Sequence, residues 1–324
     1  MVIAINSPAG AGGPLQTCPK APTPKPCQGL GMSAPAEIES FADEMANLQR
    51  EWPQLSPADR IIRLQELVDT RAGAAGFPPP DVTAPSGLGA SSGQLRFRDW
   101  EVAINDALVN RDSLTDKQAA QLGDTLYHET RHAEQWSLMA KRQAAEGLAA
   151  EQIHWQLALP GRIAREAVRD PLSATDPRRP CADALYKSVY GRDRLARNRT
   201  LTNLEDHGDD CRAANEAYKA AMTEEQRLKS QLSQEQKAYV SCKERHPPPT
   251  KSELDAMGRQ CNHTIAKLKA AQSRSEECRK AAEVAHSTYS KTYDDYRALP
   301  EEADAWDSGG RASTAIMSRL SKGA

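Results

Sequence analysis

The chain has 324 residues, a formal net charge of −2 and 27% charged residues. This length suffices for one large domain or for two ordinary ones, each able to bury a core. No stretch is dominated by Lys or Arg, which argues against nucleic acid as a partner. No apolar run approaches the roughly 20 residues that a membrane-spanning helix needs, so we expect no membrane span. Ala, Glu, Gln, Lys and Arg recur throughout, and this composition predicts a mainly helical fold.

Residues 1–35 are rich in Pro, Gly, Ala and Ser, and we predict a flexible tail there. The first residues lack the basic start and the sustained apolar core of a Sec-type signal peptide. A Pro-rich segment of this kind is also a candidate for docking to a secretion apparatus or to an SH3-like groove.

From residue 36 onward, apolar residues at spacings of three and four predict a succession of helices. Ser56 and Pro57 have the N-cap and first-turn positions of the second helix. Apolar residues within 95–104 fit one or two short strands, the one convincing strand signal in the sequence. A long helix is predicted from about residue 113 to about residue 145. We therefore predict a mainly α fold with a small β element, an α+β protein.

Residues 201–290 differ from the rest of the chain because they are very polar, lack Trp and contain few apolar positions. The sequence HPPPT at 246–250 separates two sparse apolar seams, which predicts an antiparallel helical hairpin of the coiled-coil type. The predicted organisation is a tail at 1–35, a core domain formed by 36–200 plus 291–324, and an inserted hairpin at 201–290.

Seven cysteines leave at least one thiol unpaired within the chain, and none has the paired spacing of a structural zinc site. In the hairpin, a disulfide between Cys242 and Cys261 across the Pro-rich turn is the favoured pairing. A second disulfide between Cys211 and Cys278 requires a break in the first helix near residues 222–226, because straight helices would not allow both. Four half-buried thiols without disulfides are the alternative.

The four cysteines in a helical region suggest an oxidising destination, whereas no export signal is visible. Delivery by a dedicated secretion machine, to the outside, into a target cell or into a periplasm, would reconcile the two observations. Reduced thiols in the cytoplasm fit as well, so a cytoplasmic location is the alternative.

The string YHETRHAEQ at 127–135 contains His-Glu-x-x-His within the predicted long helix. Four residues make about one helical turn, so His128 and His132 project from the same face and can bind one metal ion. Glu129 is displaced around the helix, where its carboxylate can act as general base on a zinc-activated water. The pattern therefore predicts a hydrolytic Zn²⁺ site, and an exposed helix that happens to carry two histidines is the alternative.

A catalytic zinc site needs a third protein ligand and an open fourth position. No third His follows at the short His-x-x-Gly-x-x-His distance, which argues against a metzincin. Carboxylates in the C-terminal segment 293–306 are better candidates, because Pro300 can begin a helix with Glu301 and Glu302 in its first turn. Tyr296, near Glu302 in the sequence, is the candidate for stabilising the oxyanion, with Tyr190 and Arg297 behind it and a buried structural Tyr as the alternative.

The strings YHETRHAEQW and YRALPEEADAW together resemble the zincin-like metallopeptidase domains, gluzincin in type, of bacterial secreted effectors and polymorphic toxins. The resemblance covers about residues 50–200 and 290–324. It implies a zincin-like core in which Glu302 completes a Zn²⁺ site with the two histidines, with Glu301 as the fallback ligand. It also implies that Asp304 is a carboxylate that orients a ligand His.

Two functions follow from these expectations. The first is a zinc-dependent peptidase or amide hydrolase of a secreted effector or toxin, with a peptide, protein or peptidoglycan substrate and with an immunity protein or secretion component as partner. The second is a helical interaction or scaffold protein that acts through the 201–290 hairpin and carries a non-catalytic His-Glu-x-x-His helix. Bound zinc, and loss of function in Glu129→Ala, would separate the first from the second.

Overall fold

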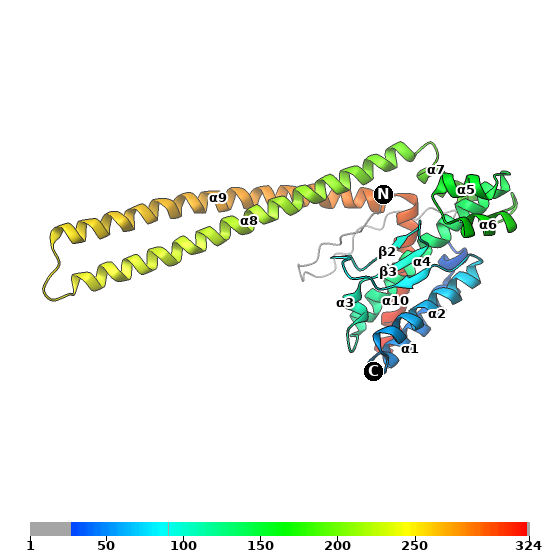
Figure 1. Ribbon diagram of the computed structural model, residues 1–324, viewed down its shortest axis with the longest axis horizontal. Helices are drawn as coiled ribbons and strands as arrows, with labels where there is room; N and C mark the ends of the chain where they lie inside the picture. Colours follow the sequence, from blue (N-terminus) through cyan, green and yellow to red (C-terminus); the bar gives the residue numbers. More distant parts are fainter. Residues whose placement is uncertain (1–26, 90, 323–324) are drawn as a thin grey trace. The chain divides into compact units, whose positions relative to one another are not determined.

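The computed structural model describes residues 27–89 and 91–322 and divides the chain into two units (Figure 1). The first unit contains the chain up to Arg197 and from Arg297 onward, and the second is Asn198–Tyr296. The prediction of a mainly helical protein with a small β element is confirmed. Among the described residues, none of the helices combines the length and the apolar character needed to cross a bilayer.

The first unit is a set of helices around a small sheet. Its helices are α1 (Pro35–Glu51), α2 (Pro57–Ala75), α3 (Asp106–Val109), α4 (Asp116–Ala145), α5 (Ala150–Leu157), α6 (Gly161–Arg169), α7 (Arg179–Val189) and α10 (Pro300–Lys322), with short 3₁₀ turns at Gly31–Ser33 (η2) and Trp52–Gln54 (η3). The second helix begins as the sequence predicts, because Ser56 caps α2 and its side chain accepts a hydrogen bond from the backbone N–H of Asp59.

The sheet has three strands, β1 (Asp81–Thr83), β2 (Gly93–Arg96) and β3 (Glu101–Ile104), in the order β1-β3-β2. Strand β3 pairs parallel with β1 and antiparallel with β2, so that Val102 lies between Val82 and Leu95. The predicted strand region 95–104 thus corresponds to β2 and β3, whereas β1, three residues long, was not predicted. Strand β2 lies at an edge of the sheet, beside α4.

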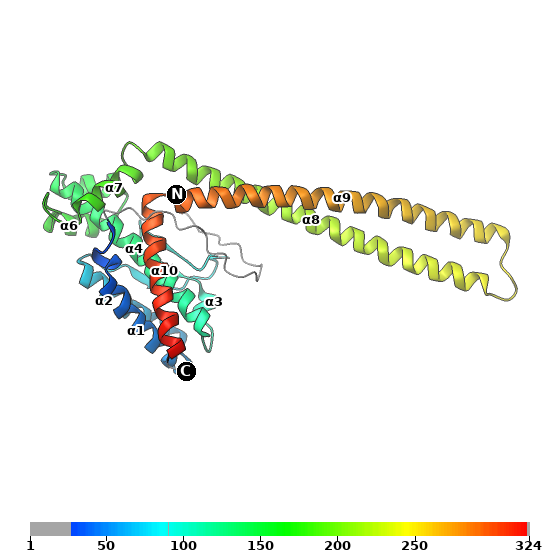
Figure 2. The same ribbon diagram turned by 180° about the vertical axis from the view of Figure 1, so that it is seen from behind.

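Helix α4 is the central element of the first unit, and almost every residue in its second half is buried. It begins with a capping box, in which the Thr115 side chain accepts from the backbone N–H of Gln118 and the Gln118 side chain accepts from that of Thr115. Helix α10 packs closely on it (Figure 2). Glycines at the contact leave room for this packing. A β-carbon at Gly123 of α4 would lie 2.3 Å from Ile316 Cδ1, and one at Gly309 of α10 would lie 2.4 Å from Asp124 Oδ1.

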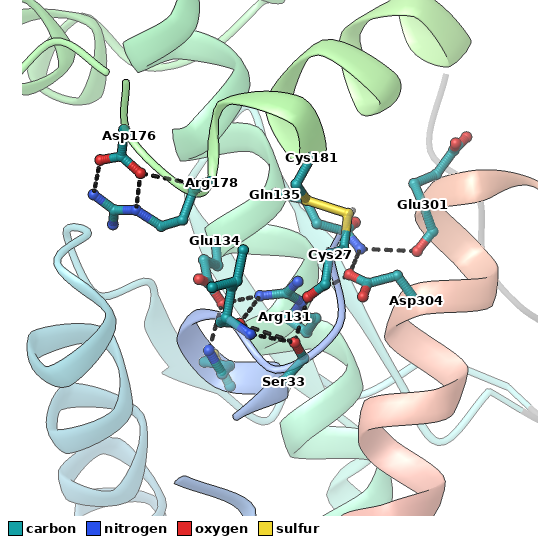
Figure 3. Close-up of a disulfide and its surroundings, with 12 residues drawn as sticks. Cys27, Ser33, Arg131, Glu134, Gln135, Asp176, Arg178, Cys181, Glu301 and Asp304 are labelled. Carbon is teal, nitrogen blue, oxygen red and sulfur yellow. Dashed lines mark hydrogen bonds and ion pairs between the residues drawn. A yellow bond between two sulfur atoms is a disulfide. The ribbon is translucent and has the colours of Figure 1, made fainter. Parts of the chain in front are cut away.

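The segment that precedes α1 is fixed in place from Cys27 onward (Figure 3). Cys27 forms a disulfide with Cys181 of α7, with a Cα–Cα distance of 4.8 Å, and both residues are buried. We call residues 27–33 the N-terminal strap. The predicted flexible tail at 1–35 is therefore wrong for its last part, while residues 1–26, including the candidate docking segment, lie outside the described residues.

The second unit is formed by the long antiparallel helices α8 (Arg194–Lys243) and α9 (Lys251–Arg297), joined by residues 244–250 (Figure 1). Few large apolar side chains of these two helices are buried. They are Leu201, Leu228 and Tyr296, and the other buried residues are small, such as Ala282. The structure therefore has a helical hairpin at 198–296, where the sequence predicts one at 201–290.

The favoured Cys242–Cys261 disulfide is wrong. Cys211, Cys242, Cys261 and Cys278 are free thiols, each half-buried, which is the alternative that the sequence left open. The register across the hairpin explains this, because Gln231 contacts Thr264. In this register Cys261 lies opposite position 234 of α8. Position 234 is eight residues before Cys242, so the two cysteines lie about 12 Å apart along the helix axis. The break near 222–226 that a second disulfide would have required is absent from the described chain, since α8 runs through these residues unbroken.

Candidate metal centre

Two histidines of α4 face each other one helical turn apart. His128 and His132 are both buried, and their Nε2 atoms lie 3.1 Å apart. Their rings meet edge to face, with centroids separated by 4.7 Å. The four-residue spacing in a regular helix produces this arrangement, as the sequence predicts.

Glu302, in the first turn of α10, is the third member of the cluster. Its Oε2 atom lies 3.5 Å from Nε2 of His132 and 3.8 Å from Nε2 of His128, and the side chain is buried. Ligand atoms of a tetrahedral zinc ion with bonds of about 2.0–2.1 Å are about 3.3–3.4 Å apart. The three donor atoms are therefore close to the spacing that a single metal ion requires, and the group could hold one.

Glu301, the fallback ligand, has other partners. Its Oε2 atom accepts a hydrogen bond of 2.8 Å from the hydroxyl of Ser188, and its Oε1 atom pairs with Arg197. Successive helical residues point about 100° apart, so only one of the two adjacent glutamates can face the histidines. The structure assigns that position to Glu302.

Gln135 determines which nitrogen of His132 carries the proton. The Gln135 amide nitrogen donates to the backbone oxygen of Glu301 at 2.9 Å and to Oδ2 of Asp304 at 2.8 Å, so both of its hydrogens have acceptors. Its oxygen must then face Nδ1 of His132, 2.9 Å away, and accept a hydrogen bond from it. Nε2 of His132 is thereby left with its lone pair directed at the cluster.

Asp304, which the resemblance implies as a carboxylate that orients a ligand His, is linked to His132 through Gln135. The same Oδ2 atom accepts from Nε of Arg131 at 2.8 Å, and Arg131 also pairs with Glu134. Glu134 in turn accepts from the backbone N–H of Met32 at 3.0 Å, so the network continues into the N-terminal strap (Figure 3). Buried hydrogen-bond networks of this kind fix the orientation of metal ligands.

Glu129, the predicted general base, lies between α4 and the sheet. It is buried, and its Oε2 atom accepts a hydrogen bond of 2.7 Å from the backbone N–H of Leu95 in β2. The strand can come this close because residue 93 is Gly: a β-carbon there would lie 2.6 Å from Thr125 Cγ2. The carboxylate is thus held beside the cluster of His128, His132 and Glu302 by an element that is remote in sequence.

The pKa values of the cluster reflect burial and mutual charge. Burial, reinforced by His132, lowers the pKa of His128 to about 3. Burial also disfavours the charged form of His132, but the Glu302 carboxylate outweighs this and raises its pKa to about 9. Burial raises the pKa of Glu129 to about 7. A bound dication would be the largest local charge and would hold both imidazoles in their neutral form.

Sequence reasoning missed two neighbours of the cluster. The Trp306 ring lies 4.7 Å from that of His128, and the Arg297 guanidinium lies 4.5 Å from the Trp306 ring. Asp124 lies one turn before His128 on α4; burial, opposed by Arg297, raises its pKa to about 6. Both could have been found from spacing, because each lies four residues from a predicted ligand.

The three residues considered for stabilising the oxyanion have different surroundings in the structure. Tyr190 is engaged elsewhere, because its hydroxyl donates to the backbone oxygen of Leu157 at 2.9 Å. Tyr296 belongs to the second unit, where its ring lies 6.0 Å from that of Tyr293, and its role stays a prediction. Arg297 stacks on Trp306, and the Trp306 ring also contacts that of His128.

Comparisons of the chain with protein-family models, with curated proteins and with solved structures found no match. The features of the chain that bear on function are therefore the cluster of His128, His132 and Glu302 and the residues around it.

Proposed function

We propose that this protein is a zinc-dependent hydrolase of peptide bonds or of related amides. Zn²⁺ is held by His128, His132 and Glu302, and Glu129 is the general base. The observation that carries the proposal is the convergence of three buried donor atoms from α4 and α10, within a few ångströms, next to a fourth buried carboxylate. Burying this many ionisable groups together is costly unless they bind a cation or one another.

When bound, Zn²⁺ would supply Lewis acidity, polarising a carbonyl group and lowering the pKa of water toward neutrality. The residues of the chain supply the rest. Glu129 has one oxygen anchored by the Leu95 N–H, which leaves the other oxygen free to accept a proton from water and to return it to the leaving amine. Gln135 keeps His132 in the tautomer that a metal ligand needs.

The edge of the sheet favours a peptide as the substrate. Strand β2 has β3 on one side only, and the Leu95 N–H on its other side points toward Glu129. An extended chain could pair with this edge by backbone hydrogen bonds and so bring one of its carbonyl groups to the metal cluster. Glu129 would then lie between the paired peptide and α4.

The buried disulfide supports a role outside a reducing cytoplasm. The Cys27–Cys181 bond closes the strap against the core, and such bonds form in oxidising compartments. A secreted effector or toxin, delivered outside the producing cell or into a periplasm, would meet this condition. In that setting the partners are the substrate, a cognate immunity protein and a component of the secretion apparatus.

The test of the general base is Glu129→Gln. We expect it to retain zinc and the wild-type circular-dichroism spectrum but to lose cleavage of a mixed peptide library by at least about 100-fold, the range for loss of general-base catalysis. Gln121→Leu, an exposed position on the same helix, is the control and should cleave as the wild type does. Full activity in Glu129→Gln would remove this residue from the mechanism.

One observation favours a second function, binding of a partner by the hairpin. Its seam buries few large side chains, while Val240 and Val284 are more than half exposed. A scaffold of this kind would depend on these exposed positions and not on Glu129. Loss of the biological effect in Val240→Lys or Val284→Lys, with Glu129→Gln still active, would favour the scaffold over the hydrolase.

A further inference from the structure

A cavity of about 220 Å³ lies along one face of α10, next to the metal cluster. Ala303, Asp307, Gly310 and Thr314 line it at spacings of three and four, which marks a single face of the helix. This is a different face from the one that packs on α4, which includes Gly309. The cavity is therefore separate from the cluster of donor atoms.

Arg297 is the unusual member of the cavity wall. It is half-buried, and it neither donates a hydrogen bond nor joins an ion pair within the part of the chain that the structure describes. Its guanidinium carries five N–H donors and lies over the Trp306 ring at 4.5 Å. Because Arg297 lines the cavity, a ligand there can accept hydrogen bonds from these donors in place of water.

The charge of the wall favours an anion. Arg297 and Arg311 both line the cavity, with Asp307 as the one acidic side chain. Asp307 lies 3.7 Å from Arg311, which also donates to the backbone oxygen of Ser33 at 3.1 Å. Asp307 is thus associated with Arg311. Arg297 acts electrostatically on Asp124 of α4 but forms no ion pair or hydrogen bond with it, so its N–H groups remain available for a ligand.

The position of Trp306 connects the cavity to the proposed chemistry. The indole lines the cavity and also contacts the ring of His128. A ligand in the cavity can therefore contact a residue that itself contacts the proposed zinc ligand His128. An extended peptide advances by about 3.3–3.6 Å per residue. A residue only a few positions from the cleaved bond could therefore place its side chain or its C-terminus in the cavity.

We propose that this cavity is a substrate subsite for a carboxylate. Arg297 binds the carboxylate, and the hydrocarbon part of the substrate group packs against Trp306. The carboxylate belongs to an Asp or Glu side chain or to the C-terminus of the substrate. A planar guanidinium that stacks on an aromatic ring and binds a carboxylate through two N–H groups is well suited to this role. The assignment to a substrate rests on the proposed hydrolase function, whereas carboxylate binding as such does not.

Binding is tested without catalysis by following the indole N–H signal of Trp306 in the ¹⁵N-labelled full-length protein, assigned with Trp306→Phe. The probes are N-acetylglutamate α-amide, with only a side-chain carboxylate, N-acetylalanine, with only a terminal one, and neutral N-acetylglutamine α-amide. We expect saturable shifts with one or both acids, weakened by salt, and none with the neutral probe. A shift of equal size with the neutral probe would overturn the proposal.

Arg297→Gln should weaken the binding of the acidic probe by at least about tenfold, because a charge-assisted pair is lost. Arg169→Gln, an exposed arginine of α6, is the matched control and should bind the probe as the wild type does. Unchanged binding in Arg297→Gln would overturn the assignment.

Cleavage of a mixed peptide library then tests the role of the site in substrate selection. We expect acidic residues, or the C-terminus, to be enriched at a fixed distance from the cleaved bond, and the ratio of acidic to neutral products to fall at least about tenfold in Arg297→Gln. Cleavage without such a preference would overturn this inference alone. Carboxylate binding without any cleavage or zinc would overturn the hydrolase function and the substrate assignment, leaving only an anion site.

Discussion

At the scale of single residues, the hydrogen bonds of Gln135 decide how His132 can bind a metal. Both amide hydrogens have fixed acceptors, Glu301 and Asp304, so the oxygen has only one orientation and must accept from Nδ1. Gln135, Glu301 and Asp304 thus set the tautomer of His132, although Gln135 contacts only Nδ1 of the ring and not Nε2, which faces the cluster. This is the part of the site that the pattern His-Glu-x-x-His does not specify.

Gln135→Leu should therefore bind zinc about 10- to 100-fold more weakly, the usual effect of losing a partner of a metal-binding histidine. Competition with a chromophoric chelator measures this affinity. Gln121→Leu serves again as control, since its side chain is exposed on the same helix. Wild-type affinity in Gln135→Leu would mean that the amide does not position His132.

Asp124 provides a second prediction at this scale. Its Oδ1 atom is buried without a hydrogen-bond partner among the described residues, and burial, opposed by Arg297, raises its pKa from 3.8 to about 6. A raised pKa in the folded state means that the folded protein binds the proton more tightly than the unfolded chain. The ionised group therefore destabilises the fold above about pH 6, and this cost disappears below about pH 4.

Asp124→Asn should accordingly raise the free energy of unfolding at pH 7, by on the order of 1–3 kcal/mol. The gain should shrink as the pH falls from about 6 to about 4, where the wild-type carboxyl is protonated. Urea unfolding at several pH values measures this. A gain that is the same at pH 4 and pH 7 would show that the charge of Asp124 is not its cause.

At the scale of elements, the site depends on how closely α10 approaches α4. Gly309 lies against Asp124, and a β-carbon there would be 2.4 Å from Oδ1 and 3.0 Å from the backbone oxygen. Gly310, the next residue, has open space around the same position. The two glycines therefore form a matched pair for testing the contact.

Gly309→Ala should lower the free energy of unfolding by about 1–3 kcal/mol through overpacking. It should also weaken zinc binding, because Glu302 moves with α10. Gly310→Ala should leave zinc binding unchanged and stabilise the helix slightly, since Ala has the higher helix propensity. Equal zinc affinity and stability in the two variants would contradict the close packing of α4 and α10.

The N-terminal strap makes a separate prediction. Its disulfide joins two cysteines that are 154 residues apart in the sequence. The strap also contributes backbone groups to the buried Arg131–Glu134 network. Cys27→Ser should lower the free energy of unfolding by about 2–5 kcal/mol, the range for a native disulfide. A thiol reductant should do the same to the wild type and have no effect on the variant.

Denaturant unfolding with and without the reductant checks this expectation. Cys261→Ser, which removes a free thiol of the hairpin, is the matched control and should unfold as the wild type does in both conditions. A wild-type protein that is equally stable with and without the reductant would show that the bond contributes nothing.

At the scale of the whole molecule, the sequence predicted best those features that depend on local helical geometry. The spacing of His128 and His132 fixes their common face, and Pro300 places Glu302 in a first helical turn. That the two helices meet depends on tertiary packing, which the sequence pattern suggested only through a resemblance. The resemblance implied Glu302 with Glu301 as the fallback, and the orientation of α10 was needed to decide between them.

Long-range pairings were the least predictable features. The Cys27–Cys181 disulfide joins segments with no shared sequence signal, and β1 is too short to show a strand pattern. In the hairpin, Gln231 lies opposite Thr264, and this register places Cys242 and Cys261 at different positions along the helix axis. Pairing such residues from their distance in sequence fails because it ignores this register.

The most direct test of the central claim is the zinc content of the purified, dialysed protein beside two adjacent variants. We predict one zinc per chain in the wild type and in Glu301→Ala, and a large loss in Glu302→Ala, because only Glu302 faces the histidines. Circular dichroism confirms that both variants are folded. A wild-type protein without zinc, or full zinc content in Glu302→Ala, would contradict the metal centre described above.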